Sequence, residues 1–307
     1  MLYEKASDMI GGTPLLDASR FCERYGVTAK ILAKLEYLNP TGSAKDRAAL
    51  YMLEEAERSG LLTPGTVVIE ETSGNTGIGL ASLCAQKGYE MIAVMPDTMS
   101  IERRKLLAAY GAKIELTPGK EGMDGACRRV EELKDEYEKV FVPSQFDNKA
   151  NPLSHYETTA PEILRDTDGK IDCFVAAFGT GGTVSGCAKY LKEQLPKIKT
   201  FAVEPESSPL VTKGYSAPHK LQGIGANFIP VNLDPSVIDE FLTAGDDESI
   251  EAARAFAKCE GVLCGISSGA ALAAAVKLAR REEYKNATIV VILCDGGERY
   301  LSSGLYE

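Results

Sequence analysis

The chain carries the stretch VVIEETSGNTG at residues 67–77, and this stretch decides the fold class. It opens with a short apolar run at 67–69, continues through a polar turn with two glycines, and leads into a helical pattern over 77–87. A strand covered on both faces has such a continuous apolar run. The stretch therefore predicts a buried strand, a tight turn and a helix, which is the repeating unit of an α/β protein.

The same alternation continues on both sides of this stretch. Further strands are predicted at 91–94, 113–116, 140–142, 173–177, 200–203 and 289–293, and helices at 47–59, 77–87, 101–110, 124–138, 183–194, 250–259 and 270–281. Gly60, Gly88, Gly111 and Gly261 follow four of these helices, as C-terminal caps do. The pattern predicts an α/β fold with two doubly wound domains and mostly parallel sheets.

The alternation runs twice, over about 45–145 and about 170–300. We expect an N-terminal α/β domain at 1–149 and a C-terminal α/β domain at 150–307, with the first ~40 residues able to cross to the other domain. Open α/β sheets bind ligands beyond the carboxyl ends of their strands. The cleft between the two domains is therefore the expected site.

Charge and composition exclude several classes of protein. The 307 residues include 34 Lys and Arg against 44 Asp and Glu, a net charge of -10. Such a chain repels phosphate backbones and anionic lipids, so we expect no nucleic acid and no membrane partner. No apolar stretch approaches the ~20 residues of a membrane span, and the first residues do not resemble a secretion signal. The eight cysteines form no CxxC pair, which predicts buried reduced thiols, no metal site and a cytoplasmic location.

A lysine stands at the start of a predicted helix in NPTGSAKDR, residues 39–47. Backbone N–H groups and the helix dipole create positive potential there, which favours an uncharged amine at Lys45. An uncharged amine suits a lysine that attacks a carbonyl carbon. Taken alone, the position is more typical of a solvated surface lysine.

Two further turns join a strand to a helix and carry donors for anions. ETSGNTG at 71–77 has two glycines and several hydroxyl or amide side chains, which suits a carboxylate, although an N-capping turn has the same composition. GTGGT at 179–183 lets the backbone approach phosphate oxygens and adds two hydroxyls. It matches neither the Walker loop nor the dinucleotide fingerprint, so it favours a monophosphate.

Two other segments complete the set, GISSGA at 265–270 before a helix and DGGERYL at 295–301 after the last strand. Each is weak evidence by itself. Together, a lysine, a phosphate loop, a carboxylate loop and a serine at a helix start match the needs of pyridoxal 5'-phosphate.

These segments resemble the cysteine synthase (O-acetylserine sulfhydrylase) family of the pyridoxal-phosphate β-family, fold type II. The resemblance runs from IGGTPL at 10–15 to GERYLS at 297–302, with all motifs in order. Relatives that deaminate serine or threonine usually carry Ser-Phe-Lys at the lysine, whereas this chain has Ser43-Ala44-Lys45. The resemblance implies a tryptophan-synthase-β-like architecture with the cofactor in the interdomain cleft.

The resemblance also implies roles for individual residues. Lys45 would hold the cofactor as an internal aldimine, and Asn75 would bind the cofactor's ring oxygen. Ser267 would meet the pyridine nitrogen. The substrate carboxylate would be bound by Thr72, Ser73, Asn75, Thr76 and Gln145, and the phosphate by Gly179, Thr180, Gly181, Gly182 and Thr183.

The implied reaction is a β-replacement in which O-acetyl-L-serine and sulfide give L-cysteine and acetate through an aminoacrylate. The alternatives are cystathionine β-synthase, or a cysteine desulfhydrase or lanthionine-type replacement on serine or cysteine. The resemblance further implies a homodimer, and a cleft that accepts the C-terminal tail of serine acetyltransferase. A nucleotide enzyme on the same fold is disfavoured by the broken fingerprint at 179–183.

The chain departs from the family pattern at four places. Glu71, Lys149 and Cys294 stand where the family usually has Pro, and Asn227 stands where it often has Gly. The nucleophile therefore stays open. His155 is interpreted as a structural residue at a helix start.

Overall fold

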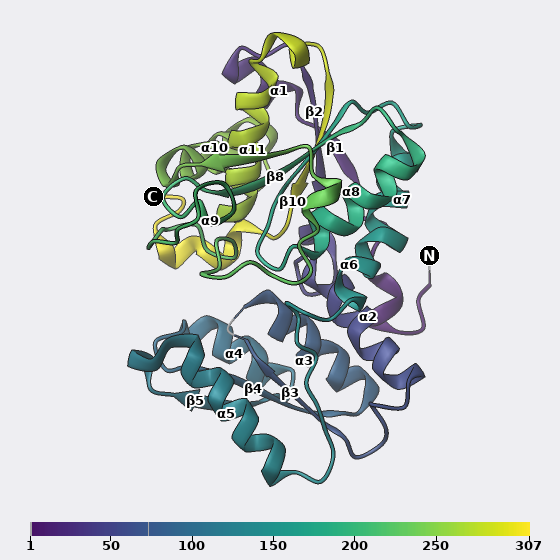
Figure 1. Ribbon diagram of the computed structural model, residues 1–307, viewed down its shortest axis with the longest axis vertical. Coiled ribbons are helices and arrows are strands. Elements are labelled where there is room, and N and C mark those ends of the chain that lie inside the picture. Colours follow the sequence, from purple (N-terminus) through teal and green to yellow (C-terminus); the bar gives the residue numbers. More distant parts are fainter. Residues whose placement is uncertain (1, 73) are drawn as a thin grey trace. The chain divides into compact units, whose positions relative to one another are not determined.

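The computed structural model describes residues 2–72 and 74–307. The chain divides into two compact units. Unit 1 consists of Met1–Ile10 and Lys45–Asn151, and unit 2 of Gly11–Ala44 and Pro152–Glu307. The chain therefore passes from unit 2 into unit 1 between Ala44 and Lys45 (Figure 1).

Unit 1 is a parallel four-stranded sheet with helices on both faces (Figure 1). Its strand order is β5-β4-β3-β6. The strands are β3 (Val67–Glu71), β4 (Glu90–Pro96), β5 (Lys113–Thr117) and β6 (Val140–Phe141), and the helices are α2 (Lys45–Arg58), α3 (Asn75–Lys87), α4 (Ile101–Ala109) and α5 (Gly122–Glu136). Short 3₁₀ turns occupy Ala6–Met9 and Gly119–Glu121.

The apolar run of β3 serves two separate cores, one on each face of the sheet. Val68 packs with residues of α2, α3 and α4. Val67 and Ile69 face the other side and pack with α5. Successive strand side chains point to opposite faces, so the run 67–69 between two helical layers is apolar on both faces.

Unit 2 has a six-stranded sheet of order β1-β2-β10-β7-β8-β9, parallel except for β1. The strands are β1 (Leu15–Asp17), β2 (Lys30–Leu35), β7 (Cys173–Ala177), β8 (Lys199–Pro205), β9 (Glu240–Ala244) and β10 (Thr288–Leu293). The helices are α1 (Ser19–Tyr25), α6 (Ala150–Ser154), α7 (Ala160–Asp166), α8 (Gly182–Gln194), α9 (Leu210–Lys213), α10 (Asp246–Glu260) and α11 (Ile266–Ala279). A π-helical turn, His155–Thr159, joins α6 to α7, and 3₁₀ turns lie at Glu36–Leu38, Pro235–Val237, Glu282–Tyr284 and Gly297–Ser303.

Two cores flank this sheet as well. Val175 of β7 and Val291 of β10 pack with α1, α10 and α11. Phe174 and Val290, their neighbours along the same strands, pack with α7 and α8. The predicted α/β class with mostly parallel sheets is therefore confirmed.

The seven predicted strands are all present, and three further strands, β1, β2 and β9, were not predicted. The predicted caps at Gly88 and Gly261 are confirmed, because both residues end their helices in the left-handed conformation. Five of the eight cysteines are buried, whereas Cys127 is exposed, so the expectation of buried thiols fails at that position.

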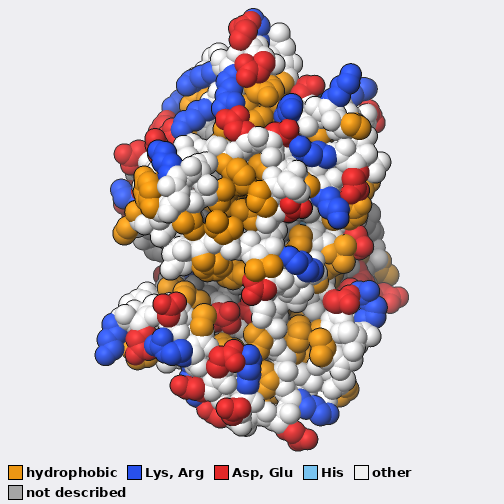
Figure 2. Space-filling model, in the orientation of Figure 1, with side chains coloured by type: hydrophobic (Ala, Val, Ile, Leu, Met, Phe, Trp, Pro, Cys, Tyr) orange, Lys and Arg blue, Asp and Glu red, His pale blue; other side chains and the backbone are white. Residues whose placement is uncertain are grey.

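The surface carries charged side chains of both signs. Figure 2 shows Lys and Arg side chains interspersed with Asp and Glu over the face that it draws. Across residues 2–72 and 74–307, no helix has both the length and the apolar character needed to cross a membrane.

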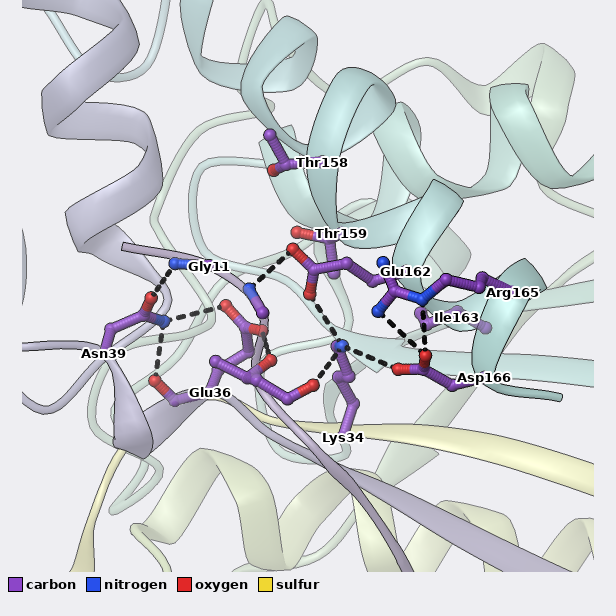
Figure 3. A network of polar contacts seen from close by, with 12 residues as sticks. Gly11, Lys34, Glu36, Asn39, Thr158, Thr159, Glu162, Ile163, Arg165 and Asp166 are labelled. Atoms are coloured by element: carbon purple, nitrogen blue, oxygen red, sulfur yellow. Dashed lines mark hydrogen bonds and ion pairs between the residues drawn. The ribbon is translucent and has the colours of Figure 1, made fainter. Parts of the chain in front are cut away.

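A buried lysine ties the first strands of unit 2 to α7 (Figure 3). Lys34 on β2 is 0% exposed, and its Nζ donates to the carbonyl oxygen of Thr13 and to Glu162 Oε2 at 2.7 Å. Asp166 Oδ2 lies 3.9 Å from the same Nζ. The other oxygen of Glu162 accepts the Gly12 N–H at 2.9 Å. The carboxylates and the carbonyl together compensate for the desolvation of the ammonium.

We expect Lys34→Met to destabilise the protein by ~3 kcal/mol, because it leaves the Glu162 carboxylate largely buried without its cation. Urea unfolding followed by circular dichroism measures the change. Lys30→Met is the matched control in the same strand, because Lys30 forms an exposed pair with Asp17 and should cost less than ~0.5 kcal/mol. Equal losses in the two variants would contradict this prediction.

Candidate active site

The carboxyl edge of the unit 1 sheet brings together two polar loops. Strands β3 and β6 are parallel neighbours, so the segments that follow them leave the same edge. Thr76 Oγ1, in the first turn of α3, donates to Gln145 Oε1 at 2.5 Å. Two residues predicted to bind the substrate carboxylate are thus in direct contact.

Thr72 and Asn75 occupy the same corner of unit 1. Asn75 is the first residue of α3. Thr72 Oγ1 accepts the N–H of Gly77 at 3.2 Å, which caps the helix start. Its own hydroxyl proton can still be donated to an anion. Ser73, predicted to bind the carboxylate, lies outside the described residues.

Lys45 is the first residue of α2, as its sequence context predicted. The two residues after it, Asp46 and Arg47, are each only 1% exposed, so the start of the helix is held in the interior. Helix α2 packs closely on α3, since a Cβ at Gly79 would lie 3.3 Å from both the Ala49 Cβ and Asp46 Oδ1. The helices that carry Lys45 and Asn75 are therefore neighbours within unit 1.

A buried carboxyl that the sequence analysis did not single out lies beneath the two loops. Glu70 on β3 is 0% exposed and accepts the N–H groups of Ser144 at 2.9 Å and Gln145 at 3.2 Å. Burial, with the charge of Glu71 adding to it, raises the pKa of Glu70 to about 8 against the opposing effect of the two N–H groups. The only sequence signal is an acidic residue at the end of an otherwise apolar strand.

The predicted phosphate loop of unit 2 joins β7 to α8. Gly181 has φ of 81° and caps α8, in the left-handed region that favours glycine. A Cβ at Gly179 would lie 2.3 Å from the Gly223 carbonyl oxygen, and one at Gly181 would lie 2.6 Å from the Leu233 nitrogen. Both positions therefore require glycine. The free N–H groups at the start of a helix bind phosphate well.

The hydroxyls of this loop belong to Thr180 and Thr183, which are 6% and 8% exposed. His155 Nε2 lies 3.1 Å from Thr183 Oγ1, and His155 Nδ1 lies 2.9 Å from Thr159 Oγ1. The interpretation of His155 as structural therefore omits its contact with a predicted phosphate ligand. His155 begins a π-helical turn, a feature that often marks functional sites. The sequence gives no sign of this turn.

Ser267 lies in the first turn of α11, beside the end of β10. It is 5% exposed. The Gly265 N–H donates to the Asp295 carbonyl oxygen at 3.0 Å, which fixes the start of α11 against the segment that follows β10. Tyr300 donates to Asp295 Oδ2 at 2.7 Å. Because β10 and β7 are parallel neighbours, Ser267 and the loop 179–183 belong to the same edge of one sheet.

These residues fit pyridoxal 5'-phosphate. The loop at 179–183 offers helix N–H groups and two hydroxyls in a backbone that admits no side chain at Gly179 or Gly181, as a phosphate requires. Lys45 supplies a primary amine, and Ser267 a hydroxyl at a helix start. The amine and the carboxylate loop belong to unit 1, and the phosphate loop and the serine belong to unit 2.

Comparison with known proteins gives a family and several close relatives. The family model described as pyridoxal-phosphate dependent enzyme matches residues 6–295. A cysteine synthase of Staphylococcus aureus (strain Mu50 / ATCC 700699) is 50% identical over 305 residues, which cover 99% of this chain and 97% of that protein.

Two solved structures are similar over nearly the whole chain. A hydrogen sulfide-producing enzyme from Fusobacterium nucleatum is 49% identical with a TM-score of 0.92, covering 98% of this chain and 99% of that chain. The cysteine synthase from Entamoeba histolytica is 44% identical with a TM-score of 0.97, covering 100% of this chain and 91% of that chain.

We expect the free energy of unfolding to depend on pH through Glu70. Its pKa is about 8 in the folded protein and 4.5 in the unfolded chain, so the folded state binds more protons between these values. Stability from this group is therefore complete below pH 4.5 and is lost as the pH rises through 8. Relative to Glu70→Gln, the wild-type melting temperature should fall between pH 5 and 8, and parallel curves for the two proteins would refute the assignment.

Proposed function

The chain belongs to the family of pyridoxal-phosphate-dependent enzymes, and from this we propose that it makes L-cysteine and acetate from O-acetyl-L-serine and sulfide. The observation that carries the proposal is the 50% identity to a cysteine synthase over 99% of the chain. The Lys45, 71–77 and 179–183 segments of the resemblance all lie inside the matched family region.

We propose that the α-carboxylate of the substrate binds at the start of α3. Thr72, Ser73 and Asn75 supply hydroxyl and amide donors there, Thr76 supplies its backbone N–H, and Gln145 supplies a second amide. The contact between Thr76 and Gln145 supports this grouping. A helix N-terminus with several polar side chains is a suitable site for a carboxylate.

The cofactor would be held by Lys45, by the loop Gly179–Thr183 at its phosphate, by Asn75 at its ring oxygen and by Ser267 at its pyridine nitrogen. When bound, pyridoxal phosphate supplies an electron sink for the bonds at the substrate Cα. A serine hydroxyl at the ring nitrogen does not stabilise a positive charge there as a carboxylate would. This favours elimination at Cβ over transamination.

Lys45 has two proposed roles. Its Nζ would hold the cofactor, and in its free form it would take the proton from the substrate Cα. Acetate leaves from Cβ with the electrons of its C–O bond. Sulfide then adds to Cβ, and Lys45 Nζ returns the proton to Cα as cysteine forms. Atoms and charges balance with no external oxidant or reductant.

A second candidate function is release of sulfide from cysteine, or another β-replacement on serine or cysteine such as cystathionine formation. The observation that favours it is the 49% identity to a hydrogen sulfide-producing enzyme. The same lysine and carboxylate loop would serve either reaction, because both begin with loss of the Cα proton.

The two units, in this proposal, are the two domains of the fold, and the protein acts in the cytoplasm as a homodimer. Five buried cysteines, and no disulfide within the described part of the chain, suit a reducing compartment. The dimer rests on the family resemblance, and light scattering of the purified protein tests it. The carboxylate loop would also accept the C-terminal tail of serine acetyltransferase.

We expect Lys45→Ala to lower cysteine formation from O-acetylserine and sulfide by about a thousandfold or more, because no other group is assigned to move the Cα proton. Lys105→Ala, at an exposed lysine of α4, is the control and should keep full activity. The wild-type visible absorption band should move on addition of O-acetylserine and revert on addition of sulfide. Turnover retained in Lys45→Ala would contradict the catalytic role assigned to Lys45.

The two candidate reactions separate in a paired rate measurement. We expect wild-type enzyme to form cysteine from O-acetylserine and sulfide at least about tenfold faster than it releases sulfide from cysteine. The reverse ratio, with a visible band that responds to serine or cysteine alone, would favour the second function.

A peptide that ends in isoleucine should compete with O-acetylserine, since its terminal carboxylate meets the same donors. Inhibition that rises with peptide and falls with added O-acetylserine is the expected result. A peptide with an amidated C-terminus is the control, and absence of competition by the free-acid peptide removes this partner.

A further inference from the structure

Glu70 is the only residue of β3 whose carboxyl group is fully buried. Its neighbour Glu71 is partly exposed and interacts with Lys134 and Glu131 of α5. Both oxygens of Glu70 are engaged with one adjoining turn: Oε2 accepts the N–H of Ser144 at 2.9 Å and Oε1 accepts the N–H of Gln145 at 3.2 Å. The carboxyl group therefore spans two consecutive backbone donors.

This turn has an unfavourable backbone that needs support. Ser144 has φ of 54°, in the left-handed region that a serine seldom adopts. Its carbonyl oxygen accepts the N–H groups of Asp147 at 3.0 Å and Asn148 at 2.9 Å, so the chain reverses tightly. Two adjacent N–H groups that point the same way form an anion-binding concavity. Glu70 fills that concavity from within the protein.

The same turn fixes Gln145 at three points. Glu70 holds its backbone N–H, Asn151 Nδ2 donates to its carbonyl oxygen at 2.8 Å, and Thr76 donates to its side-chain Oε1 at 2.5 Å. With Oε1 accepting from Thr76, the Nε2 end of the amide carries the N–H donors. Gln145 is 9% exposed, so its amide has little freedom to turn.

We propose that Glu70 is a positioning residue for substrate binding: by holding the Ser144–Gln145 turn it directs the Gln145 amide toward the substrate carboxylate. The inference rests on the proposed function, which makes Gln145 a carboxylate ligand. Glu70 lies two residues before Thr72, so one strand end supports both loops that meet the carboxylate. Glu70 itself touches neither substrate nor cofactor.

The test compares Glu70→Gln with Glu90→Gln above pH 8, where the Glu70 carboxyl is ionised. The first variant keeps the shape of the side chain but places an NH₂ group against one of the two N–H donors. The second makes the same change at the first residue of β4, an exposed carboxylate that pairs with Lys113. We expect Glu70→Gln to raise the KM for O-acetylserine about tenfold with kcat changed less than about threefold, and Glu90→Gln to change neither by more than about twofold.

A double-mutant cycle separates positioning from general loss of structure. In a Gln145→Ala background, Glu70→Gln should change KM by less than about twofold, because the residue it positions is gone. Hydrogen exchange of the cofactor-free protein at the same pH gives a readout independent of activity: the amides of Ser144 and Gln145 should exchange about tenfold faster in Glu70→Gln than in Glu90→Gln.

Two results would overturn the inference. One is an unchanged KM in Glu70→Gln, and the other is an equal rise in KM with and without the Gln145 side chain. If Glu70→Gln does not fold, Glu70→Asp keeps both acceptor oxygens on a shorter stem and should raise KM in the same direction by a smaller factor. Wild-type enzyme that makes no cysteine would overturn the proposed function and this inference together, whereas active wild type with an unaffected Glu70→Gln overturns the inference alone.

Discussion

The parallel pairing of β2 with β10 is the constraint on which the rest of the structure depends. Residues Lys30 to Leu35 pair in parallel with Thr288 to Leu293 along the whole strand, and Lys34 forms a buried ion pair with Glu162. The chain that leaves β2 is tied again to the end of β10, where the Ala44 N–H donates to the Cys294 carbonyl oxygen at 2.8 Å. Ala44 is the last residue of this part of unit 2, and Lys45 begins α2 in unit 1.

Much of the fold could be predicted because its strands are covered on both faces. The strands β3, β4, β7 and β10 are nearly continuous apolar runs, which few other structures require. Strand β2 was not predicted because Lys30 and Lys34 interrupt its apolar run. A lysine is buried only where carboxylates compensate for its charge. Glu162 lies far from Lys34 in the sequence, so no local pattern indicates the pair. Strand β9 was not predicted because it is partly exposed and includes the polar residues Glu240 and Thr243.

Some residues of the candidate site could likewise be predicted from the sequence, and others could not. Thr76, Lys45 and the glycines of 179–183 could be proposed from sequence because helix starts and tight turns have local signatures. Glu70 and His155 could not, since their importance lies in the partners that folding brings to them, Ser144 and Gln145 in one case and Thr183 in the other. The functional residues that local pattern misses are those that act through a second residue.

The pairing of β2 with β10 also has a consequence for synthesis on the ribosome. Most of unit 1 is a continuous stretch, Lys45–Asn151, which can pack as soon as it emerges. Unit 2 needs β2 and its last strand, β10, side by side, so its sheet stays open until Thr288–Leu293 has been translated. Until then the edges of β2 and β7 that face β10 are unpaired, and unpaired strand edges can pair with strands of other chains and aggregate. A truncation that removes β10 would therefore yield an aggregating nascent chain with one finished unit, rather than a smaller soluble protein.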